Sequence, residues 1–191
     1  MQNISDLKKT EIPATVDTAT FGMGCFWCTE AVFLQLKGVI SATSGYSGGK
    51  TPNPTYRQVC DGQTGHAEVC QVVFDTAQIS FTELLEVFWT AHDPTTLNRQ
   101  GADHGTQYRS VIFYHNEIQK RISEDFKKRL DLENAFPDPV ITEISPITTF
   151  YKAEDYHLDY YARNQAAPYC QMVIQPKVEK IRKVFSERIK R

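Results

Sequence analysis

The segment from residue 21 to residue 30 reads Phe21-Gly22-Met23-Gly24-Cys25-Phe26-Trp27-Cys28-Thr29-Glu30. Just before it, residues 18–21 alternate polar and apolar side chains as a strand does, and Gly22 and Gly24 permit the backbone angles of a tight turn. A short amphipathic helix that Gly38 can end is predicted by Ala31, Val32, Leu34 and Leu36. The stretch therefore predicts a strand that turns into a helix, with Cys25 at the junction.

A cysteine at the start of a helix is a candidate nucleophile. Unpaired backbone N–H groups and the positive end of the helix dipole favour an anion there. We therefore expect the pKa of the Cys25 thiol to be lowered, so that the reactive thiolate forms. We also expect the flanking glycines to leave Cys25 exposed, unlike a cysteine that serves as a small buried hydrophobe.

Cys28 lies about one helical turn after Cys25, on nearly the same face. A Cys-x-x-Cys pair is typical of a redox couple or of half a zinc site. One alternative is therefore a thioredoxin-like dithiol oxidoreductase. Another is a zinc-binding interaction module that would add Cys60, His66 or Cys70, although the sequence lacks the second closely spaced ligand pair that structural zinc sites usually have. We expect no metal and no prosthetic cofactor.

Length and composition indicate an ordinary soluble globular protein. The 191 residues fit one domain, residues 18–191, preceded by a polar, flexible N-terminal arm, residues 1–17. A net charge of −2 disfavours nucleic acid as a partner. No apolar run reaches the roughly 18–20 residues of a membrane span, and five cysteines, an odd number, argue against a secreted disulfide framework. We expect a cytoplasmic monomer.

The order of elements predicts the fold class. Strands are expected at 18–21, 39–46, 68–74, 110–114 and 140–144. Helices are expected after Cys25, after a capping box at Ser80 and Glu83, after the cap Asn116, and at 176–190, with a long polar loop at 95–107. In the third helix, one apolar face comprises Ile118, Ile122, Phe126 and Leu130. Two βαβ units in this order favour an α/β two-layer sandwich of the ferredoxin-like, split βαβ type with a C-terminal extension.

The last predicted helix is basic and amphipathic. Such a helix can meet an anionic membrane or a partner, but Glu179 and Glu187 dilute its charge. We therefore expect its apolar face to pack on the core.

Two further segments carry candidate chemistry. Glu68 stands at the edge of an otherwise apolar strand, and such surroundings raise the pKa of a carboxyl so that it stays protonated and can donate. A solvated charge at a strand end is the alternative interpretation. Residues 103–110 place many hydrogen-bonding side chains in a loop that enters a strand, where catalytic groups often lie. Phe26 and Trp27 offer an apolar wall beside Cys25, although adjacent aromatics are more often core residues.

Seven motifs in order give the chain a resemblance to a known family, the peptide methionine sulfoxide reductases of the A type. They are Gly24-Cys25-Phe26-Trp27, Ser44-Gly45-Tyr46-Ser47-Gly48-Gly49, Pro52-Asn53-Pro54-Thr55-Tyr56, Gly65-His66-Ala67-Glu68, His92-Asp93-Pro94-Thr95, Asn98-Arg99-Gln100-Gly101 and Gly105-Thr106-Gln107-Tyr108-Arg109-Ser110. The likeness runs from about Phe21 to Cys170, nearly the whole domain.

The resemblance implies an enzyme that reduces methionine-S-sulfoxide, free or in proteins, and so repairs oxidised proteins. In that family pattern Cys25 matches the nucleophile and Glu68 the acid. Tyr56 and Tyr108 match hydroxyls near the sulfoxide oxygen, and Asp103 a polar pocket residue. Phe26 and Trp27 match the hydrophobic pocket for the methyl group.

The resemblance also implies a thiol cycle. Cys25 becomes a sulfenic acid, a second thiol converts it to a disulfide, and thioredoxin resets that disulfide by exchange. We expect Cys28 to be the main resolving thiol, because i,i+3 spacing suits a disulfide, and Cys170 to be secondary. We interpret Cys60 and Cys70, which have apolar sequence neighbours, as structural.

Overall fold

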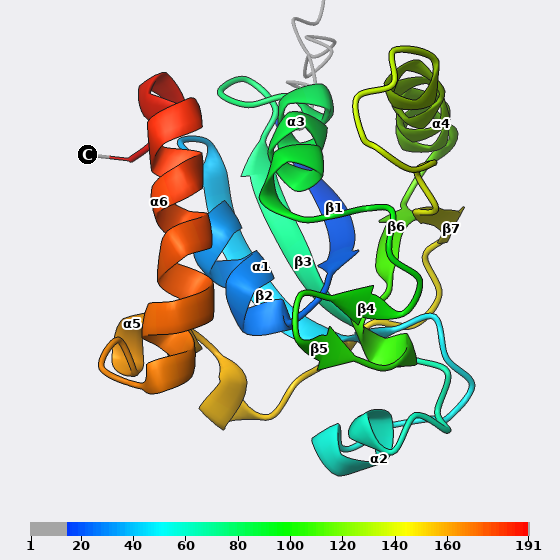
Figure 1. Cartoon of the computed structure of the whole chain (residues 1–191), viewed down its shortest axis with the longest axis vertical. Helices are drawn as coiled ribbons and strands as arrows, with labels where there is room; N and C mark the ends of the chain where they lie inside the picture. The colour runs from blue at the N-terminus through cyan, green and yellow to red at the C-terminus, as the bar shows by residue number, and fades with distance from the viewer. Residues whose placement is uncertain (1–14, 191) are drawn as a thin grey trace, which may run out of the picture.

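The computed structural model describes residues 15–190 and is built on a mixed six-stranded sheet (Figure 1). The strands are β1 (Val16–Met23), β2 (Val39–Ser47), β3 (Ala67–Asp75), β6 (Ser110–Tyr114), β7 (Glu143–Pro146) and β8 (Tyr151–Lys152). Across the sheet they run in the order β7-β6-β1-β3-β2-β8. Only β6 and β7 pair in parallel; the other neighbours are antiparallel.

The four central strands confirm the predicted split βαβ fold. The first unit runs β1-α1-β2 and leaves a gap that β3 fills; the second runs β3-α3-β6 and leaves a gap that β1 fills. The sheet therefore has β1 and β3 at its centre, paired from Val16↔Asp75 to Phe21↔Cys70. Because β1 and β3 are antiparallel, the C-terminal end of β1 lies beside the N-terminal end of β3.

Helices cover one face of this sheet. They are α1 (Phe26–Phe33), α3 (Phe81–Ala91), α4 (Glu117–Leu132) and α6 (Gln175–Val184), and Figure 1 shows α1 and α3 in front of the strands with α6 beside α1. The main core lies between the two layers, where Phe21 of β1 stacks on Phe33 and Phe81 and packs against Phe88. The opposite face carries a smaller cluster around Val69 and Val111, covered by Ile147 and Phe150.

Local capping signals predicted the helix starts. Ser80 and Glu83 form a reciprocal capping box at α3, and the Asn116 side chain accepts a hydrogen bond from Gln119 N at α4. Of the predicted apolar face of α4, Ile122, Phe126 and Leu130 pack on the core. Ile118, in the first turn of α4, is however 62% exposed, so the apolar face contacts the core only from Ile122 onward.

Two predicted elements lie elsewhere than expected. The strand expected at 140–144 begins only at Glu143, since Val140 N and Ile141 N bond instead to Asp131 Oδ1 and Pro94 O. The helix expected at 176–190 is preceded by a π-helical turn, Cys170–Ile174, and ends at Val184. Beyond it, a bridge between Leu36 and Ile189 draws the chain away from the helix axis.

The polar segments also hold more structure than the sequence suggested. Within the expected loop 95–107, β4 (Arg99–Gln100) and β5 (Asp103–His104) form a small hairpin, followed by a 3-10 turn, Thr106–Tyr108. The expected loop before Tyr56 ends in a short helix, α2 (Tyr56–Cys60), whose capping box joins Thr55 and Gln58. A further short helix, α5 (Tyr160–Arg163), precedes the π-helical turn.

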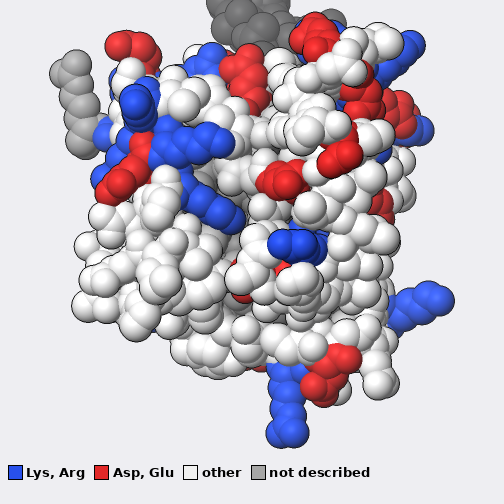
Figure 2. Space-filling view, viewed as in Figure 1, with Lys and Arg blue, Asp and Glu red and all other residues white. Residues whose placement is uncertain are grey.

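Three further expectations concern the N-terminal arm, membrane-spanning segments and the packing of the last helix. Residues 1–14 of the expected arm lie outside the described part of the chain, and the last two residues of that arm, 16 and 17, belong to β1. Between residues 15 and 190, no helix combines the length and apolarity that a bilayer crossing requires. Basic side chains gather over α6 (Figure 2), whose Val178 and Ile181 are buried, so this helix packs on the body as expected.

Candidate active site

Cys25 lies at the N-cap of α1, immediately after the central strand β1. Its side chain is only 6% exposed, so the expectation of an exposed thiol is wrong. Gly24 adopts a φ of +91°, and its backbone packs so closely on Gln100 that an added Cβ would lie 2.7 Å from Gln100 Cβ. The glycines therefore let neighbouring segments close over the cysteine.

The expected fall in the pKa of Cys25 is also wrong. Burial raises the pKa of this thiol well above its usual value, and the neighbouring Cys28 raises it further. The Tyr169 hydroxyl and the Trp27 amide oppose this rise in the pKa but are outweighed. The amide contribution is the helix N-terminus effect that the sequence predicted; desolvation exceeds it. Cys25 is therefore a thiol in the resting protein.

Cys28 behaves in the opposite way. Its pKa is lowered, mainly because the Cys25 thiol donates a hydrogen bond to its sulfur, with a further contribution from the positive charge of Lys177. The two residues occupy adjacent positions in the first turn of α1, where Cys28 N donates to Cys25 O at 3.1 Å. In this pair, the Cys25 sulfur is therefore the hydrogen-bond donor and the Cys28 sulfur is the acceptor.

Cys170 joins the same cluster from the other end of the chain. Cys25, Cys28 and Cys170 are all buried, with Ala31, Ile174 and Val178 around them. Cys170 begins the π-helical turn, and burial together with the nearby Cys25 raises its pKa. All three are free thiols. The fold therefore brings together the three cysteines named from the sequence as redox candidates.

Glu68 lies near the start of β3, beside the end of β1, and is 1% exposed. Its Oε2 accepts a hydrogen bond from Phe26 N at 3.0 Å, so the carboxyl group is bound to the amide that follows Cys25. Its Oε1 has no partner in the described structure. Burial, reinforced by Cys25, raises the pKa of Glu68 well above its usual value. Glu68 is therefore a buried acid that holds its proton to a higher pH than usual, and the alternative of a solvated strand-end charge is excluded.

Tyr56 and Tyr108 are half-buried, and the Glu68 carboxyl affects the pKa of both phenols. Burial is the main cause that raises the pKa of each phenol, and Glu68 is the next. The ring of Tyr56 stacks on Phe26 with centroids 6.2 Å apart, and Tyr108 packs against the three-cysteine cluster. Both hydroxyls therefore keep their protons, and the hydroxyl of Tyr56 donates a hydrogen bond to the Cys60 sulfur.

Asp103 reaches the site through Tyr169. Its Oδ2 accepts a hydrogen bond from the Tyr169 hydroxyl at 2.8 Å. Tyr169 also contacts the sulfur of Cys25, and its pKa is raised, first by burial and then by the two cysteines. Asp103 thus orients a phenol that faces the thiol pair.

Phe26 and Trp27 lie where an apolar wall was expected. Phe26 is buried beneath Tyr46 and Tyr56, while Trp27 is partly exposed. The indole of Trp27 stacks on Tyr160 with centroids 3.7 Å apart and an interplanar angle of 7°, and it meets Tyr169 edge-on. These rings, together with Tyr108, form an aromatic surface beside Cys25.

Sequence reasoning missed the residues that hold this surface from behind. Glu154 accepts hydrogen bonds from Tyr46 and Tyr56, and His157 accepts one from Trp27. Residues 151–161 are dense in tyrosines and ionisable side chains outside any strong periodic pattern. That composition was a signal for a functional loop, but it does not indicate which element the loop contacts.

The remaining cysteines differ from each other. Cys70 is buried in the main core, as expected. Cys60 is exposed at the end of α2, so its apolar sequence context was misleading: Val59 beside it points inward and Cys60 outward. His66, a ligand candidate in the zinc alternative, bonds instead to Gly49 N and Thr51 O. Within residues 15–190, no three histidine, cysteine or acidic side chains gather as a metal site requires.

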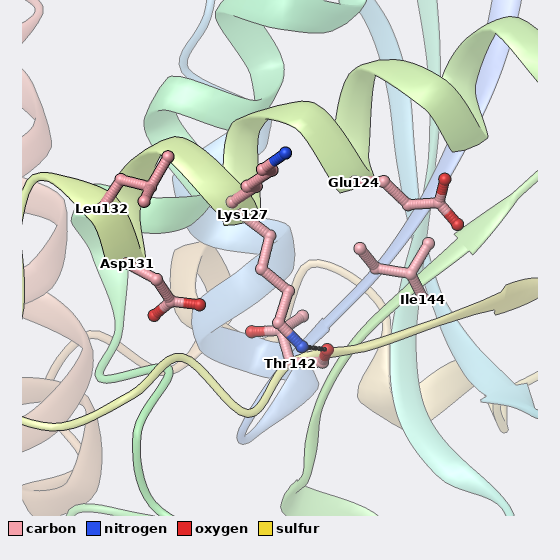
Figure 3. A pocket seen from close by; sticks show the side chains of 7 residues that line it. Glu124, Lys127, Asp131, Leu132, Thr142 and Ile144 are labelled. Carbon is pink, nitrogen blue, oxygen red and sulfur yellow. Dashed lines mark hydrogen bonds between the residues drawn. The ribbon is translucent and has the colours of Figure 1, made fainter.

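A hollow of about 500 Å³ lies away from this cluster, between α4 and the segment that leads into β7 (Figure 3). Lys127 crosses it and donates to Thr142 O at 2.8 Å. Its lining contains neither a thiol nor an aromatic ring: Glu124, Lys127, Lys128, Asp131, Leu132, Thr142 and Ile144. This hollow therefore contains none of the thiols that the sequence names as redox candidates.

Comparisons with known proteins agree with this geometry. Residues 17–189 match the family model described as peptide methionine sulfoxide reductase. The chain is 54% identical over 175 residues to peptide methionine sulfoxide reductase MsrA of Saccharolobus solfataricus, covering 92% of this chain and 98% of that protein.

Two solved structures extend the comparison. The reduced form of Mxr1 from Saccharomyces cerevisiae matches with a TM-score of 0.77 and 35% identity, covering 83% of this chain and 91% of that one. Mxr1 in complex with Trx2 matches with a TM-score of 0.55 and 25% identity, covering 78% and 86%. With a family match across almost the whole sequence, relatives at half identity, and a buried thiol beside a buried acid, the chain belongs to the peptide methionine sulfoxide reductase family.

Proposed function

We propose that this enzyme reduces methionine-S-sulfoxide, free or in proteins, to methionine, with Cys25 as the nucleophile and Glu68 as the general acid. The observation that carries the proposal is the hydrogen bond from Phe26 N to Glu68 Oε2, which ties a buried, protonated carboxyl to the amide beside a buried thiol. The free Oε1 of Glu68 supplies an unused polar atom for a substrate.

The first step needs an acid because the sulfoxide oxygen leaves poorly until it is protonated. The sulfur of Cys25 attacks the substrate sulfur while Glu68 gives its proton to the oxygen, and the proton of the Cys25 thiol restores the carboxyl. The intermediate collapses to methionine and a Cys25 sulfenic acid. One thiol and one sulfoxide thus give one thioether and one sulfenic acid, so atoms and electrons balance.

The phenols assist where negative charge develops on oxygen. Tyr56 and Tyr108 stay protonated beside Glu68 and can donate to the sulfoxide oxygen. Asp103 contributes indirectly, since it accepts the Tyr169 hydroxyl that faces Cys25. Phe26 and Trp27 receive the methyl group of the substrate on the aromatic surface, which distinguishes the methyl from the oxygen by shape and polarity.

Cys28 is proposed as the main resolving thiol and Cys170 as the secondary one. In the resting protein, the hydrogen bond from the Cys25 thiol is the main cause that lowers the pKa of Cys28, and the positive charge of Lys177 adds to it. The thiol hydrogen bond is lost when Cys25 becomes a sulfenic acid, but the charge of Lys177 remains and favours the thiolate, which is the attacking species, whereas the pKa of Cys170 is raised. The Cys28 sulfur attacks the sulfenic acid sulfur, a Cys25–Cys28 disulfide forms, and the oxygen leaves as water after it takes up a proton. Lys177 favours the attacking charge.

An external dithiol then reduces the disulfide, and no prosthetic cofactor takes part. Thioredoxin is the proposed reductant, supported by the yeast relative Mxr1, which was solved in complex with Trx2. We further propose that residues 18–191 act as one domain and as a monomer, in the cytoplasm, where five cysteines would remain thiols.

Epimer selectivity tests the activity. The purified enzyme is incubated with both epimers of methionine sulfoxide and excess dithiothreitol, and the remaining substrate is separated by chiral chromatography. We expect the S epimer to disappear and the R epimer to persist. Equal loss of the two epimers would contradict the proposed pocket.

Disulfide mapping tests the order of the thiols. The reduced protein receives one equivalent of methionine-S-sulfoxide, is alkylated and digested without reduction, and is analysed by mass spectrometry. We expect Cys25–Cys28 as the first disulfide. A first bridge between Cys25 and Cys170, or thioredoxin turnover that survives Cys28→Ser and is lost in Cys170→Ser, would reverse the assignment.

A further inference from the structure

The segment that follows β8 places two ionisable side chains, Glu154 and His157, behind the aromatic surface. It is held against the sheet because Ala153 N donates to Ser44 O at 3.0 Å, and it ends in a 3-10 turn, Asp155–His157. His157 is 1% exposed and Glu154 is half-buried. The proposed reaction uses neither of them.

His157 binds the indole of Trp27. Trp27 Nε1 donates to His157 Nδ1 at 3.0 Å, and an indole N–H is only ever a donor. Nδ1 must therefore be unprotonated, which puts the proton of the neutral ring on Nε2. That nitrogen is buried without a hydrogen-bond partner and lies 4.0 Å from Glu154 Oε2. The carboxylate thus favours the one tautomer that can accept from Trp27.

The same pair contacts the rest of the aromatic surface. The ring of His157 lies 5.0 Å from that of Phe26 and 4.4 Å from that of Tyr56, centroid to centroid. Glu154 Oε1 accepts from Tyr56 N and Oε2 accepts from the Tyr46 hydroxyl, both at 2.8 Å. One short segment therefore contacts α1, α2 and the end of β2 where they support the aromatic surface beside Cys25.

The bond to His157 fixes the rotation of the indole. Stacking on Tyr160 holds the plane of the Trp27 ring but allows it to slide and turn within that plane. A hydrogen bond at the edge of the ring removes this freedom, and a side chain without an acceptor at 157 would leave the N–H buried and unpaired.

We propose that His157, oriented by Glu154, is a positioning residue for substrate recognition: its Nδ1 fixes Trp27 and so sets the shape of the wall that receives the methyl group of methionine sulfoxide. This inference rests on the proposed function. It predicts a direct spectroscopic sign at Trp27 as well as a change in substrate affinity.

NMR of the indole N–H groups tests the bond to Trp27 directly. The chain has two tryptophans, so protein labelled with ¹⁵N-tryptophan gives two indole N–H signals, and Trp89→Phe assigns them. Trp89 Nε1 has no hydrogen-bond partner in the described structure and serves as an internal reference. We expect His157→Phe to move the Trp27 signal upfield toward that of Trp89, and His157→Asn, whose amide oxygen occupies nearly the position of Nδ1, to keep it downfield.

Kinetics complete the test. In single-turnover assays with methionine-S-sulfoxide, His157→Phe should raise the half-saturating concentration about tenfold and change the limiting rate less than threefold, and His157→Asn should restore the wild-type value. In a Trp27→Phe background, His157→Phe should add no further loss. As a control, His115→Phe removes a histidine bonded to Thr20 in the sheet and should change neither readout.

Several results would overturn the inference. They are an unmoved Trp27 signal in His157→Phe, equal kinetic losses in the Phe and Asn variants, or a Trp27 shift in His115→Phe. If His157→Phe does not fold, His157→Leu and His157→Asn carry the same comparison. A wild-type protein without activity would refute the proposed function, while the indole signals would still test the bond.

Discussion

His92 should make the stability of this protein fall steeply as the pH drops. It is buried between α3 and β6, with Nδ1 2.7 Å from Phe88 O and Nε2 2.7 Å from Ser110 Oγ. Burial lowers the pKa of His92 to about 4, and Lys177 and Lys180 act in the same direction, while the bond to Phe88 O and the charge of Asp93 oppose it. The imidazole is therefore neutral in the folded state.

The sign and size of the effect follow from linkage. Because the folded pKa of His92 lies below the value of about 6.5 in an unfolded chain, the unfolded state binds the proton first as the pH falls. The contribution of His92 to stability is thus complete above about pH 6.5 and declines until the pH reaches about 4. At about 1.4 kcal/mol per pKa unit, the free energy of unfolding should fall by about 2 to 3 kcal/mol between pH 7 and pH 4.5 from this residue alone.

Urea unfolding of the reduced protein at several pH values measures this loss. His92→Gln provides the comparison, because glutamine keeps hydrogen-bonding capacity but does not titrate, and a constant loss of stability cancels when only the pH dependence is compared. The wild type should lose about 2 to 3 kcal/mol more than His92→Gln over this range. Parallel curves for the two proteins would refute the assignment of a buried neutral imidazole.

The proposed chemistry makes further predictions that single-turnover measurements can check. Glu68→Gln, which keeps a hydrogen-bond donor but no transferable proton, should slow sulfoxide reduction about 10²- to 10⁴-fold, and an unchanged rate would remove Glu68 from the acid role. Cys25→Ser should form no sulfenic acid on addition of methionine-S-sulfoxide, as read with a dimedone-type probe; labelling that persists would place the nucleophile elsewhere. Cys28→Ser should label more strongly than the wild type, because the sulfenic acid then waits for a slower resolving thiol, and weak labelling would argue that Cys170 resolves first.

The parts of the fold that follow from short-range signals could be predicted from the sequence. Glycines around Cys25, the capping box at Ser80 and the cap at Asn116 act within a few residues, so the turn and the helix starts were correct. The limits of the last helix were not, because the bridge between Leu36 and Ile189 joins distant segments. No local pattern reports such a pairing.

The same distinction applies to the site. The resemblance named the candidate residues, but the state of Cys25 depends on residues far along the chain. Cys170 and Ile174 pack around Cys25, and burial raises its pKa, while the Tyr169 hydroxyl opposes that rise. The position of Cys25 at a helix N-terminus, taken alone, predicted a lowered pKa for its thiol. Glu154 and His157 escaped notice for a related reason, since their contacts with α1 and α2 span about a hundred residues or more.

The central pair of strands gives this enzyme a particular vulnerability. Side chains alternate between the faces of a strand, so a slip of β1 by one residue along β3 would turn the buried Phe21 out of the main core and would also move the amide next to Cys25 away from Glu68. Gly22 sits at this point, where an added Cβ would lie 2.7 Å from Val111 Cγ1 and 3.0 Å from Glu68 O. We therefore expect one residue inserted between Gly22 and Cys25 to shift the Cys25 thiol relative to Glu68 even where residues 16–21 keep their pairing with β3. The pairing of β1 with β3 thus sets both the packing of the core and the position of Cys25 relative to Glu68.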